Sequence, residues 1–306
     1  MEKIEGKTSF ITGAASGIGF GIAEAFSDAG MKVVMADVEG DALAEAAEKL
    51  AQKSDHILAI VLDVTDRAAM AAAADEAEEA FGPVHVVCNN AGVSNRGPLD
   101  EASYEDWDWV VGVNLGGVIN GIKTFVPRIK SQHACSGEGG HVINTASIAG
   151  LLAGAGNGLY ATTKHAVVGL SVALHQELKP LGIGVSVLCP GTVDTKINYS
   201  SRNRPKGFGP GGMDLDPEQI ALLDRSMKLG SSSREIGEIV VGSILSEDLY
   251  ILPHGEFSAV YQKKMEEILA SFSNKPPTQN QLESMQLRAE AFSGFWNDGG
   301  PSTEEI

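Results

Sequence analysis

The sequence predicts an α/β fold, in which one doubly wound parallel sheet of about seven strands carries helices on both faces. Short, nearly continuous apolar runs recur along the chain, and such runs are typical of strands that are buried on both faces. Helical stretches rich in Ala and Glu lie between the runs. This alternation indicates parallel strands joined by right-handed helical crossovers.

The predicted elements follow one another in a regular order. The expected strands are Thr8–Ile11, Lys32–Ala36, Ile57–Leu62, Val84–Cys88, His141–Thr145, Gly184–Leu188 and Leu249–Leu252. A first helix is expected at Gly17–Ala29, after a glycine-rich loop. Asp41–Lys53 and Arg67–Phe81 have apolar residues at helical spacing, and Asp66 is placed to cap the second of these helices.

Two later stretches depart from this pattern. Asn198–Gly212 is polar and glycine-rich, and we expect it to form a lid together with a helix near Pro217–Met227. Its Arg202 and Arg204 either recognise a substrate carboxylate or are solvated, and solvation is favoured. The end of the chain, residues 256–306, is expected to be a helical extension packed on the nucleotide-binding and catalytic domain of residues 1–255.

Composition and charge exclude several classes of function. The 306 residues are 43% hydrophobic, which is enough for a large core. The net charge of −17 repels nucleic-acid backbones and anionic lipid, so neither is an expected partner. A dinucleotide can still bind, because backbone dipoles at a pocket act locally. Cys88, Cys135 and Cys189 form no CxxC motif, which argues against a disulfide framework and a metal site.

No targeting signal is visible at the start of the sequence. Met1–Lys7 contains no apolar stretch, which argues against a signal peptide. No apolar run of about 18 residues occurs that would suggest a membrane span. A cytoplasmic location is therefore expected.

A glycine-rich loop joins the first predicted strand to the first helix. It reads Thr12-Gly13-Ala14-Ala15-Ser16-Gly17-Ile18-Gly19. Its glycines permit a tight turn and a close approach to a pyrophosphate, and the helix N-terminus offers unpaired N–H groups. This arrangement predicts a Rossmann-type dinucleotide site that includes Gly13, Ser16, Gly17, Ile18 and Gly19.

The end of the second strand indicates which dinucleotide binds. Asp37 lies 18 residues beyond Gly19, where a carboxylate can accept hydrogen bonds from the adenosine ribose and repel a 2′-phosphate. Ser16 and Val38 provide no cation for such a phosphate. NAD is therefore favoured over NADP, although Asp37 could also be an ordinary turn residue at the end of a strand.

The motifs taken together resemble the short-chain dehydrogenase/reductase family. The resemblance covers about residues 5–255 and is carried by Thr12–Gly19, Asp63, Asn89-Asn90-Ala91-Gly92, Asn114, Ser147, Tyr160-x-x-x-Lys164 and Pro190-Gly191. It implies an NAD-dependent oxidoreductase acting on CH–OH groups, with a single Rossmann-type domain.

The resemblance also implies a catalytic set of four residues. Tyr160 and Lys164 are four apart and so share one face of a helix. Tyr160 would act as the acid/base, with the Lys164 ammonium and the oxidised nicotinamide lowering the pKa of its phenol. Ser147 would hold the substrate oxygen. Asn114 would hold a water against the lysine in a proton relay.

Further cofactor contacts follow from the same resemblance. Asp63 would bind near the adenine amino group, with Val64 packing nearby. Asn90, Ala91 and Gly92 would line the adenosine side. The segment after the sixth strand would hold the nicotinamide carboxamide through Pro190, Gly191, Val193 and Thr195.

The substrate is expected to be a bulky, mainly apolar secondary alcohol or ketone. The apolar segment Ile148–Ala153 suggests that one wall of the substrate pocket is hydrophobic. The chain also resembles the bacterial Cα-dehydrogenases of lignin-derived aryl alcohols at Asn203-Arg204-Pro205 and Leu252–Gly255. A homodimer or homotetramer is expected from the wider family. The alternative function is a non-catalytic NAD-binding sensor or scaffold, because a fold does not fix an activity.

Overall fold

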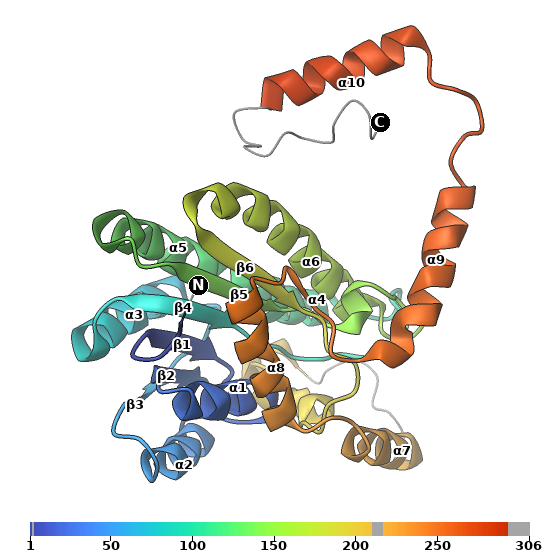
Figure 1. Cartoon of the computed structure of the whole chain (residues 1–306). Coiled ribbons are helices and arrows are strands. Elements are labelled where there is room, and N and C mark those ends of the chain that lie inside the picture. The colour runs from blue at the N-terminus through green and yellow to red at the C-terminus, as the bar shows by residue number, and fades with distance from the viewer. Residues whose placement is uncertain (2, 210–216, 293–306) are drawn as a thin grey trace.

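The sheet of the protein is parallel throughout, in the order β3-β2-β1-β4-β5-β6-β7 (Figure 1). The computed structural model describes residues 1, 3–209 and 217–292. The strands are β1 (Thr8–Thr12), β2 (Lys32–Asp37), β3 (Ile57–Val61), β4 (Val84–Asn89), β5 (Gly140–Thr145), β6 (Ile183–Leu188) and β7 (Tyr250–Ile251). The predicted doubly wound sheet is therefore confirmed. From β1 the chain winds outward through β2 to β3, then returns to β4 on the other side of β1 and winds outward through β5 and β6. The winding direction thus reverses between β1 and β4, and ligands bind at such a switch point.

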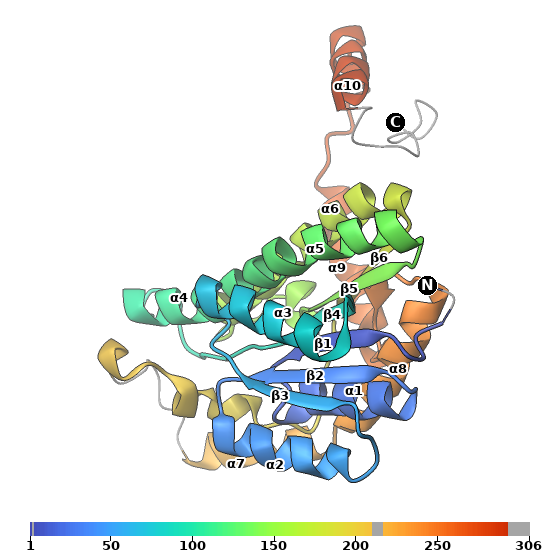
Figure 2. The same ribbon diagram turned by 90° about the vertical axis from the view of Figure 1, so that its left-hand side faces the viewer.

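Helices cover both faces of this sheet (Figures 1 and 2). One layer contains α1 (Gly17–Asp28), α2 (Gly40–Ala51) and α8 (Ser233–Ser246), and the other contains α3 (Arg67–Phe81), α5 (Gly117–Ser136) and α6 (Gly158–Leu178). α3 begins where the sequence predicts, because the Asp66 carboxylate accepts hydrogen bonds from the N–H groups of Ala68 and Ala69 at 2.8 and 2.9 Å.

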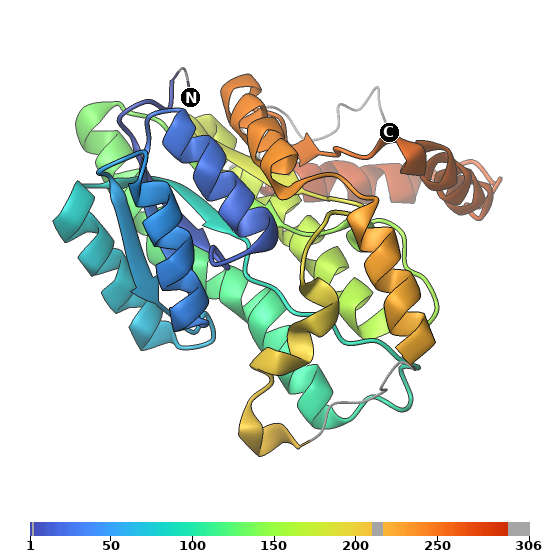
Figure 3. The ribbon, with the colours of Figure 1, turned by 90° about the horizontal axis from the view of Figure 1, so that it is seen from below.

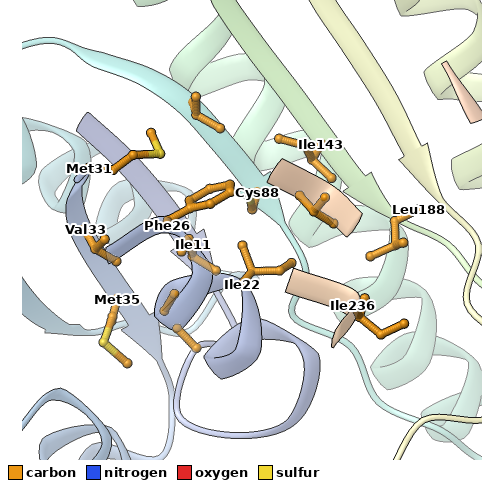
Figure 4. Close-up of a cluster of buried hydrophobic side chains, with 14 of the residues drawn as sticks. Ile11, Ile22, Phe26, Met31, Val33, Met35, Cys88, Ile143, Leu188 and Ile236 are labelled. Atoms are coloured by element: carbon orange, nitrogen blue, oxygen red, sulfur yellow. The ribbon is translucent and has the colours of Figure 1, made fainter. Parts of the chain in front are cut away.

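Alternate residues of each central strand face opposite layers. Ile11, Val33 and Met35 pack with Ile22 and Phe26 of α1 in one core cluster, and all five are fully buried (Figure 4). The intervening residues of the same strands belong to a second cluster on the other face. Burial on both faces explains why the strands appear in the sequence as unbroken apolar runs.

One long helical segment combines three elements. α4 (Tyr104–Val111), a π-helical turn at Gly112–Gly116 and α5 run without interruption from Tyr104 to Ser136. By length and hydropathy this segment could cross a membrane, contrary to the expectation that the sequence holds no such run. Half of its apolar window is buried, and α5 packs against β4 and β5. Its hydrophobic character therefore serves the core.

The predicted lid is built from short helices. η4 (Ile197–Asn203) and η5 (Lys206–Phe208) precede α7 (Pro217–Lys228), and Figure 3 shows the gold η4 and η5 segment beside α4. The end of the predicted lid loop, residues 210–212, lies outside the described residues.

The C-terminal segment continues beyond η6 (Gly255–Phe257) as two helices. α9 (Ser258–Ala270) contacts the body, where Lys264 Nζ donates a hydrogen bond to the Leu151 carbonyl oxygen at 2.6 Å. α10 (Gln279–Phe292) has no buried residue and stands away from the body in Figures 1 and 2. The division of the chain at residue 255 remains a prediction, and residues 293–306 lie outside the described part.

Candidate functional site

A cavity of about 250 Å³ opens at the carboxyl ends of the strands, beside the switch point between β1 and β4. The predicted site residues that line it are Gly13, Ser16, Gly17, Ile18, Asp37, Val38, Asp63, Val64, Asn90, Ala91, Gly92, Ser147, Tyr160, Lys164, Pro190, Gly191, Val193 and Thr195. Gly19 and Asn114 were also predicted for the site, and both lie just behind its described lining.

The glycine loop has the geometry of an anion-binding turn. Gly13 and Gly17 adopt left-handed backbone conformations, with φ of 67° and 55°. A Cβ at Gly19 would lie 2.1 Å from the Gly13 carbonyl oxygen, so only glycine fits there. Ser16 is the N-cap of α1 but makes no side-chain cap hydrogen bond. The first N–H groups of the helix are therefore not satisfied by their cap residue and can serve a bound anion.

The segment after β4 supports this loop. The Thr12 hydroxyl oxygen accepts hydrogen bonds from the N–H groups of Asn90 and Ala91 at 2.9 and 3.1 Å. In return, the Asn90 side-chain amide donates to the Thr12 carbonyl oxygen at 3.0 Å. These bonds fix the position of the glycine loop relative to the centre of the sheet.

Asp37 lies at the end of β2, at one end of the cavity. Its carboxylate accepts hydrogen bonds from the N–H groups of Ala15 and Glu39, both at 3.0 Å. Burial raises the pKa of the carboxyl, and the two N–H groups oppose this rise. Asp63 also lines the cavity, and its carboxylate accepts hydrogen bonds from the N–H and hydroxyl of Thr65 at 2.9 and 2.8 Å.

Tyr160 and Lys164 lie on one face of α6, at the other end of the cavity. The Lys164 ammonium nitrogen is 5.5 Å from the centre of the Tyr160 ring and donates a hydrogen bond to the Thr145 carbonyl oxygen at 2.8 Å. Lys164 is 2% exposed, and this burial lowers its pKa to about 8. The side chain therefore remains mostly protonated at pH 7.

The pKa of Tyr160 is raised in this structure. Burial is the main cause, while a side-chain hydrogen bond with Ser147 and the charge of Arg96 act in the opposite direction. The lowering by Lys164 that the sequence suggested is not found for the chain by itself. The cost of burying a phenolate exceeds its stabilisation by the neighbouring positive charges, so the pKa of the phenol rises.

Ser147 and Asn114 are held by short networks. The Ser147 hydroxyl oxygen accepts a hydrogen bond from the Ala149 N–H at 3.1 Å, which places it at the start of η2 (Ile148–Gly150). Asn114 is fully buried on the π-helical turn, and it bonds both the N–H and the carbonyl oxygen of Val93, at 2.8 and 2.9 Å. Its amide also donates to the Thr163 hydroxyl at 3.1 Å, one residue before Lys164.

The apolar part of the cavity differs from the one predicted. Its apolar lining includes Val93, Trp109, Val113 and Met227, whereas Ile148–Ala153 is absent from the described lining. The Leu151 carbonyl oxygen of this segment accepts a hydrogen bond from Lys264 of α9.

A sequence model of the short chain dehydrogenase family matches residues 7–206. The chain belongs to this family. It is thus an oxidoreductase that acts on CH–OH groups, as its motifs implied.

Relatives and solved structures extend this similarity over most of the chain. The C alpha-dehydrogenase of Sphingobium sp. strain SYK-6 is 37% identical over 299 residues, which are 97% of this chain and 96% of the relative. The 1-deoxy-11-beta-hydroxypentalenate dehydrogenase of Streptomyces exfoliatus is 38% identical over 72% of this chain and 78% of its own length.

Among solved structures, a short-chain dehydrogenase from Burkholderia phymatum in complex with NAD has a TM-score of 0.81 and 36% identity, covering 91% of this chain and 100% of that one. The apo form of LigO from Sphingobium sp. strain SYK-6 has a TM-score of 0.76 and 36% identity, covering 95% and 98%.

The segment predicted to form a lid in this short-chain dehydrogenase is anchored by a buried ion pair that the sequence did not reveal. Arg204 contacts Asp106 at 2.6 Å, with side-chain exposures of 5% and 0%, and its guanidinium lies 5.4 Å from the centre of the Trp109 ring. The expectation of a solvated Arg204 is therefore wrong. Each side chain neutralises the charge of the other. A buried charge without such a partner would strongly destabilise the protein.

A second ion pair anchors the predicted lid near Asp37, at the end of β2. Arg202 forms a fork with Glu39, through Nε and Nη2 at 2.7 to 3.2 Å, and the Asn203 amide donates to the same carboxylate at 2.9 Å. The hydrogen bond from Arg202 is the main cause of a lowered Glu39 pKa. All three residues line the cavity, so the lid spans it from the β2 end to α4.

His254 supports the loop after β6. Its Nδ1 accepts a hydrogen bond from the Gly191 N–H, and its Nε2 lies 3.0 Å from the Thr192 carbonyl oxygen. The resemblance noted for Leu252–Gly255 did not predict this contact, which joins residues 63 positions apart.

Proposed function

We propose that this dehydrogenase transfers a hydride between NAD(H) and a bulky, mainly apolar secondary alcohol or ketone, aryl compounds included, with Tyr160 as the acid/base. One observation carries the proposal: a single cavity joins Asp37 at one end to the hydrogen-bonded Ser147 and Tyr160 at the other. A dinucleotide lying between these ends would place its reactive ring beside the Tyr160 hydroxyl.

The residues present fit NAD. The N-terminus of α1 offers N–H groups to a pyrophosphate, and Asp37 offers a carboxylate to the adenosine ribose. Arg202, which lines the cavity, is already bound by Glu39 and so favours no additional phosphate. The NAD complex of the relative from Burkholderia phymatum supports the same choice. When bound, NAD(H) supplies or accepts the hydride.

The side chains of this chain would handle the oxygen and the proton. Ser147 and Tyr160 can hold the substrate oxygen between their hydroxyls. Tyr160 would take the alcohol proton during oxidation and return it during reduction. The Lys164 ammonium, close to the ring, would favour the phenolate at that moment. Asn114 would fix the segment after β4 and α6 around this group through Val93 and Thr163.

The lining of the cavity supports a bulky substrate. Trp109, Val113 and Met227 provide apolar surface, and the lid would exclude water during the reaction. The similarity to a C alpha-dehydrogenase supports trying aryl substrates first. We further propose a cytoplasmic protein that assembles as a homodimer or homotetramer.

The test is a screen of secondary alcohols, aryl alkanols included, with NAD supplied and NADH fluorescence recorded near ~450 nm. Growth of the signal with one class of alcohol is expected and would identify the substrate type. Tight NADH binding without turnover of any alcohol or ketone would instead support the alternative of a non-catalytic NAD-binding sensor.

A further inference from the structure

A second carboxylate lies beside Asp37 at the end of the cavity where the adenosine ribose is proposed to bind. Glu39 follows Asp37 by two positions, and its N–H donates a hydrogen bond to the Asp37 carboxylate at 3.0 Å. Both residues line the cavity. Burial is the main cause of the raised pKa of Asp37, and the charge of Glu39 contributes to it. The Glu39 carboxylate therefore acts on the same region of the cavity as Asp37.

Arg202 presents one edge of its guanidinium to Glu39. Its Nε lies 3.0 and 3.2 Å from the two carboxylate oxygens, and its Nη2 lies 2.7 Å from Oε1. The remaining nitrogen, Nη1, donates hydrogen bonds to the carbonyl oxygens of Lys196 and Tyr199 at 3.2 and 2.9 Å. These last two bonds tie the guanidinium to its own segment of the chain, so they do not depend on Glu39.

The edge that Glu39 occupies is the one with which an arginine binds phosphate. Two parallel N–H groups match two oxygens of a phosphate as well as they match a carboxylate. The side chains of Arg202 and Glu39 are 35% and 28% exposed, and both residues line the cavity. Without the Glu39 carboxylate, this edge of Arg202 would be open to a phosphate bound in the cavity.

We propose that Glu39 determines cofactor specificity by occupying an arginine that would otherwise bind the 2′-phosphate of NADP. Asp37 repels this phosphate directly, whereas Glu39 acts through Arg202. The inference rests on the proposed position of the ribose beside Asp37, and it does not require the proposed hydride transfer. The two carboxylates would then exclude NADP by two separate effects.

The test compares the dissociation constants of NADH and NADPH, both measured by the fluorescence of the nicotinamide that they share. The two cofactors differ only in the 2′-phosphate, so the ratio of the constants isolates its contribution and cancels a general weakening of the site. In Glu39→Ala we expect the ratio to shift about tenfold or more toward NADPH, since hydrogen bonds between charged groups are strong. Helix α2 should keep its start, because its N-cap Glu39 makes no side-chain cap hydrogen bond.

Arg202→Gln decides whether this shift comes from the arginine. By itself it should not shift the ratio toward NADPH, because it leaves the Glu39 carboxylate in place without its cation. Combined with Glu39→Ala, it should abolish most of the shift that Glu39→Ala produces. The same comparisons in the Asp37→Ala chain, where the direct repulsion of the phosphate is gone, should show the same dependence on Arg202.

Glu78→Ala is the matched control. Glu78 is 29% exposed and pairs with Arg128 at 2.6 Å outside the described cavity lining, so the variant removes the same charge and should keep the parent ratio. An unchanged ratio in Glu39→Ala, or a shift that persists in the double variant, would overturn this inference alone. Equal binding of NADH and NADPH by the parent chain would overturn the proposed NAD preference and this inference with it. The assay records binding only, so a failure of the proposed hydride transfer would not alter its result.

Discussion

Tyr160 and Lys164 illustrate how one residue's environment decides its chemistry. Both side chains are removed from water, so burial raises the pKa of the phenol and lowers that of the ammonium. These shifts move the two pKa values apart, since both lie near ~10 in water, whereas here the phenol lies above its ordinary value and the ammonium is at about 8. A bound ligand therefore has to favour the phenolate before Tyr160 can act as a base near neutral pH.

Tyr160→Phe removes the hydroxyl and keeps the ring. We expect NADH to bind as in the parent chain, because the ring packing is unchanged, and turnover to fall at least ~100-fold, because general acid–base groups contribute about that much. Steady-state kinetics with an alcohol found in the screen, together with NADH titration, gives both values. Turnover within a few-fold of the parent would remove Tyr160 from the acid/base role.

Asp37 determines the cofactor preference in our interpretation. Asp37→Ala should narrow the preference for NAD over NADP about tenfold, because it removes both the ribose contact and the repulsion of a 2′-phosphate. The ratio of kcat/KM for the two cofactors measures this effect. Asp37→Ala also removes the hydrogen bonds that the Ala15 and Glu39 N–H groups donate to the carboxylate. Asp37→Asn keeps an acceptor oxygen for these two bonds and is therefore the control for their loss. Unchanged selectivity in both variants would refute the ribose assignment.

At the scale of elements, the lid depends on two ion pairs that differ in burial. Arg204–Asp106 is buried against Trp109, whereas the Arg202 side chain is 35% exposed in its pair with Glu39. A buried charge that loses its partner destabilises a protein far more than an exposed one, since water cannot replace the partner. The Arg204–Asp106 pair on α4 should therefore contribute more to stability than the Arg202–Glu39 pair.

Arg204→Gln should lower the free energy of unfolding by about 3 kcal/mol, because it leaves the Asp106 carboxylate buried without its cation. Arg202→Gln, the exposed control, should lower it by less than about 1 kcal/mol. Urea unfolding measures both values. The double variant Asp106→Asn, Arg204→Gln should be more stable than the sum of the single effects predicts. Additive losses would show that the two side chains do not act as a pair.

The same elements show what a sequence can predict. The glycine loop, the Tyr160-x-x-x-Lys164 pair and the Asp66 cap depend on residues within a few positions of each other, and all three were placed correctly from spacing alone. Arg204 and Asp106 are 98 positions apart, and Arg202 and Glu39 are 163 apart. Only the folded chain brings such charges together, and each sits in a polar stretch that looks solvated in isolation.

For the whole molecule, the order of the sheet explains why distant motifs form one site. The residues after β1, β2, β4, β5 and β6 all reach the same edge because the strands are parallel. The apolar lining was harder to predict, since Trp109 and Met227 come from helices whose packing direction no local pattern specifies. The C-terminal helices carry apolar residues without a buried face, so their place could not be inferred from amphipathic pattern.

Acid stability is a property of the whole molecule, and the buried His141 contributes to it. His141 in β5 is fully buried, its Nε2 lies 2.8 Å from the Ser186 hydroxyl, and burial lowers its pKa to about 3. Its ordinary pKa is near ~6.5, so between pH 6.5 and 3 the unfolded chain binds a proton that the folded chain does not. Stability is therefore lost as the pH falls through this window.

Between pH 7 and pH 5, His141 alone should remove about 2 kcal/mol from the free energy of unfolding, since one pKa unit corresponds to about 1.4 kcal/mol. Carboxylates with lowered pKa values, such as Glu138 at about 2, lose their contribution only below pH ~4.5 and so do not interfere. Urea unfolding of the parent and of His141→Asn at both pH values isolates the effect. The variant should be less stable at pH 7 but should lose about 2 kcal/mol less on acidification. An equal loss in both proteins would mean that His141 is protonated in the folded chain or titrates normally, and the acid sensitivity would then have to be assigned to other groups.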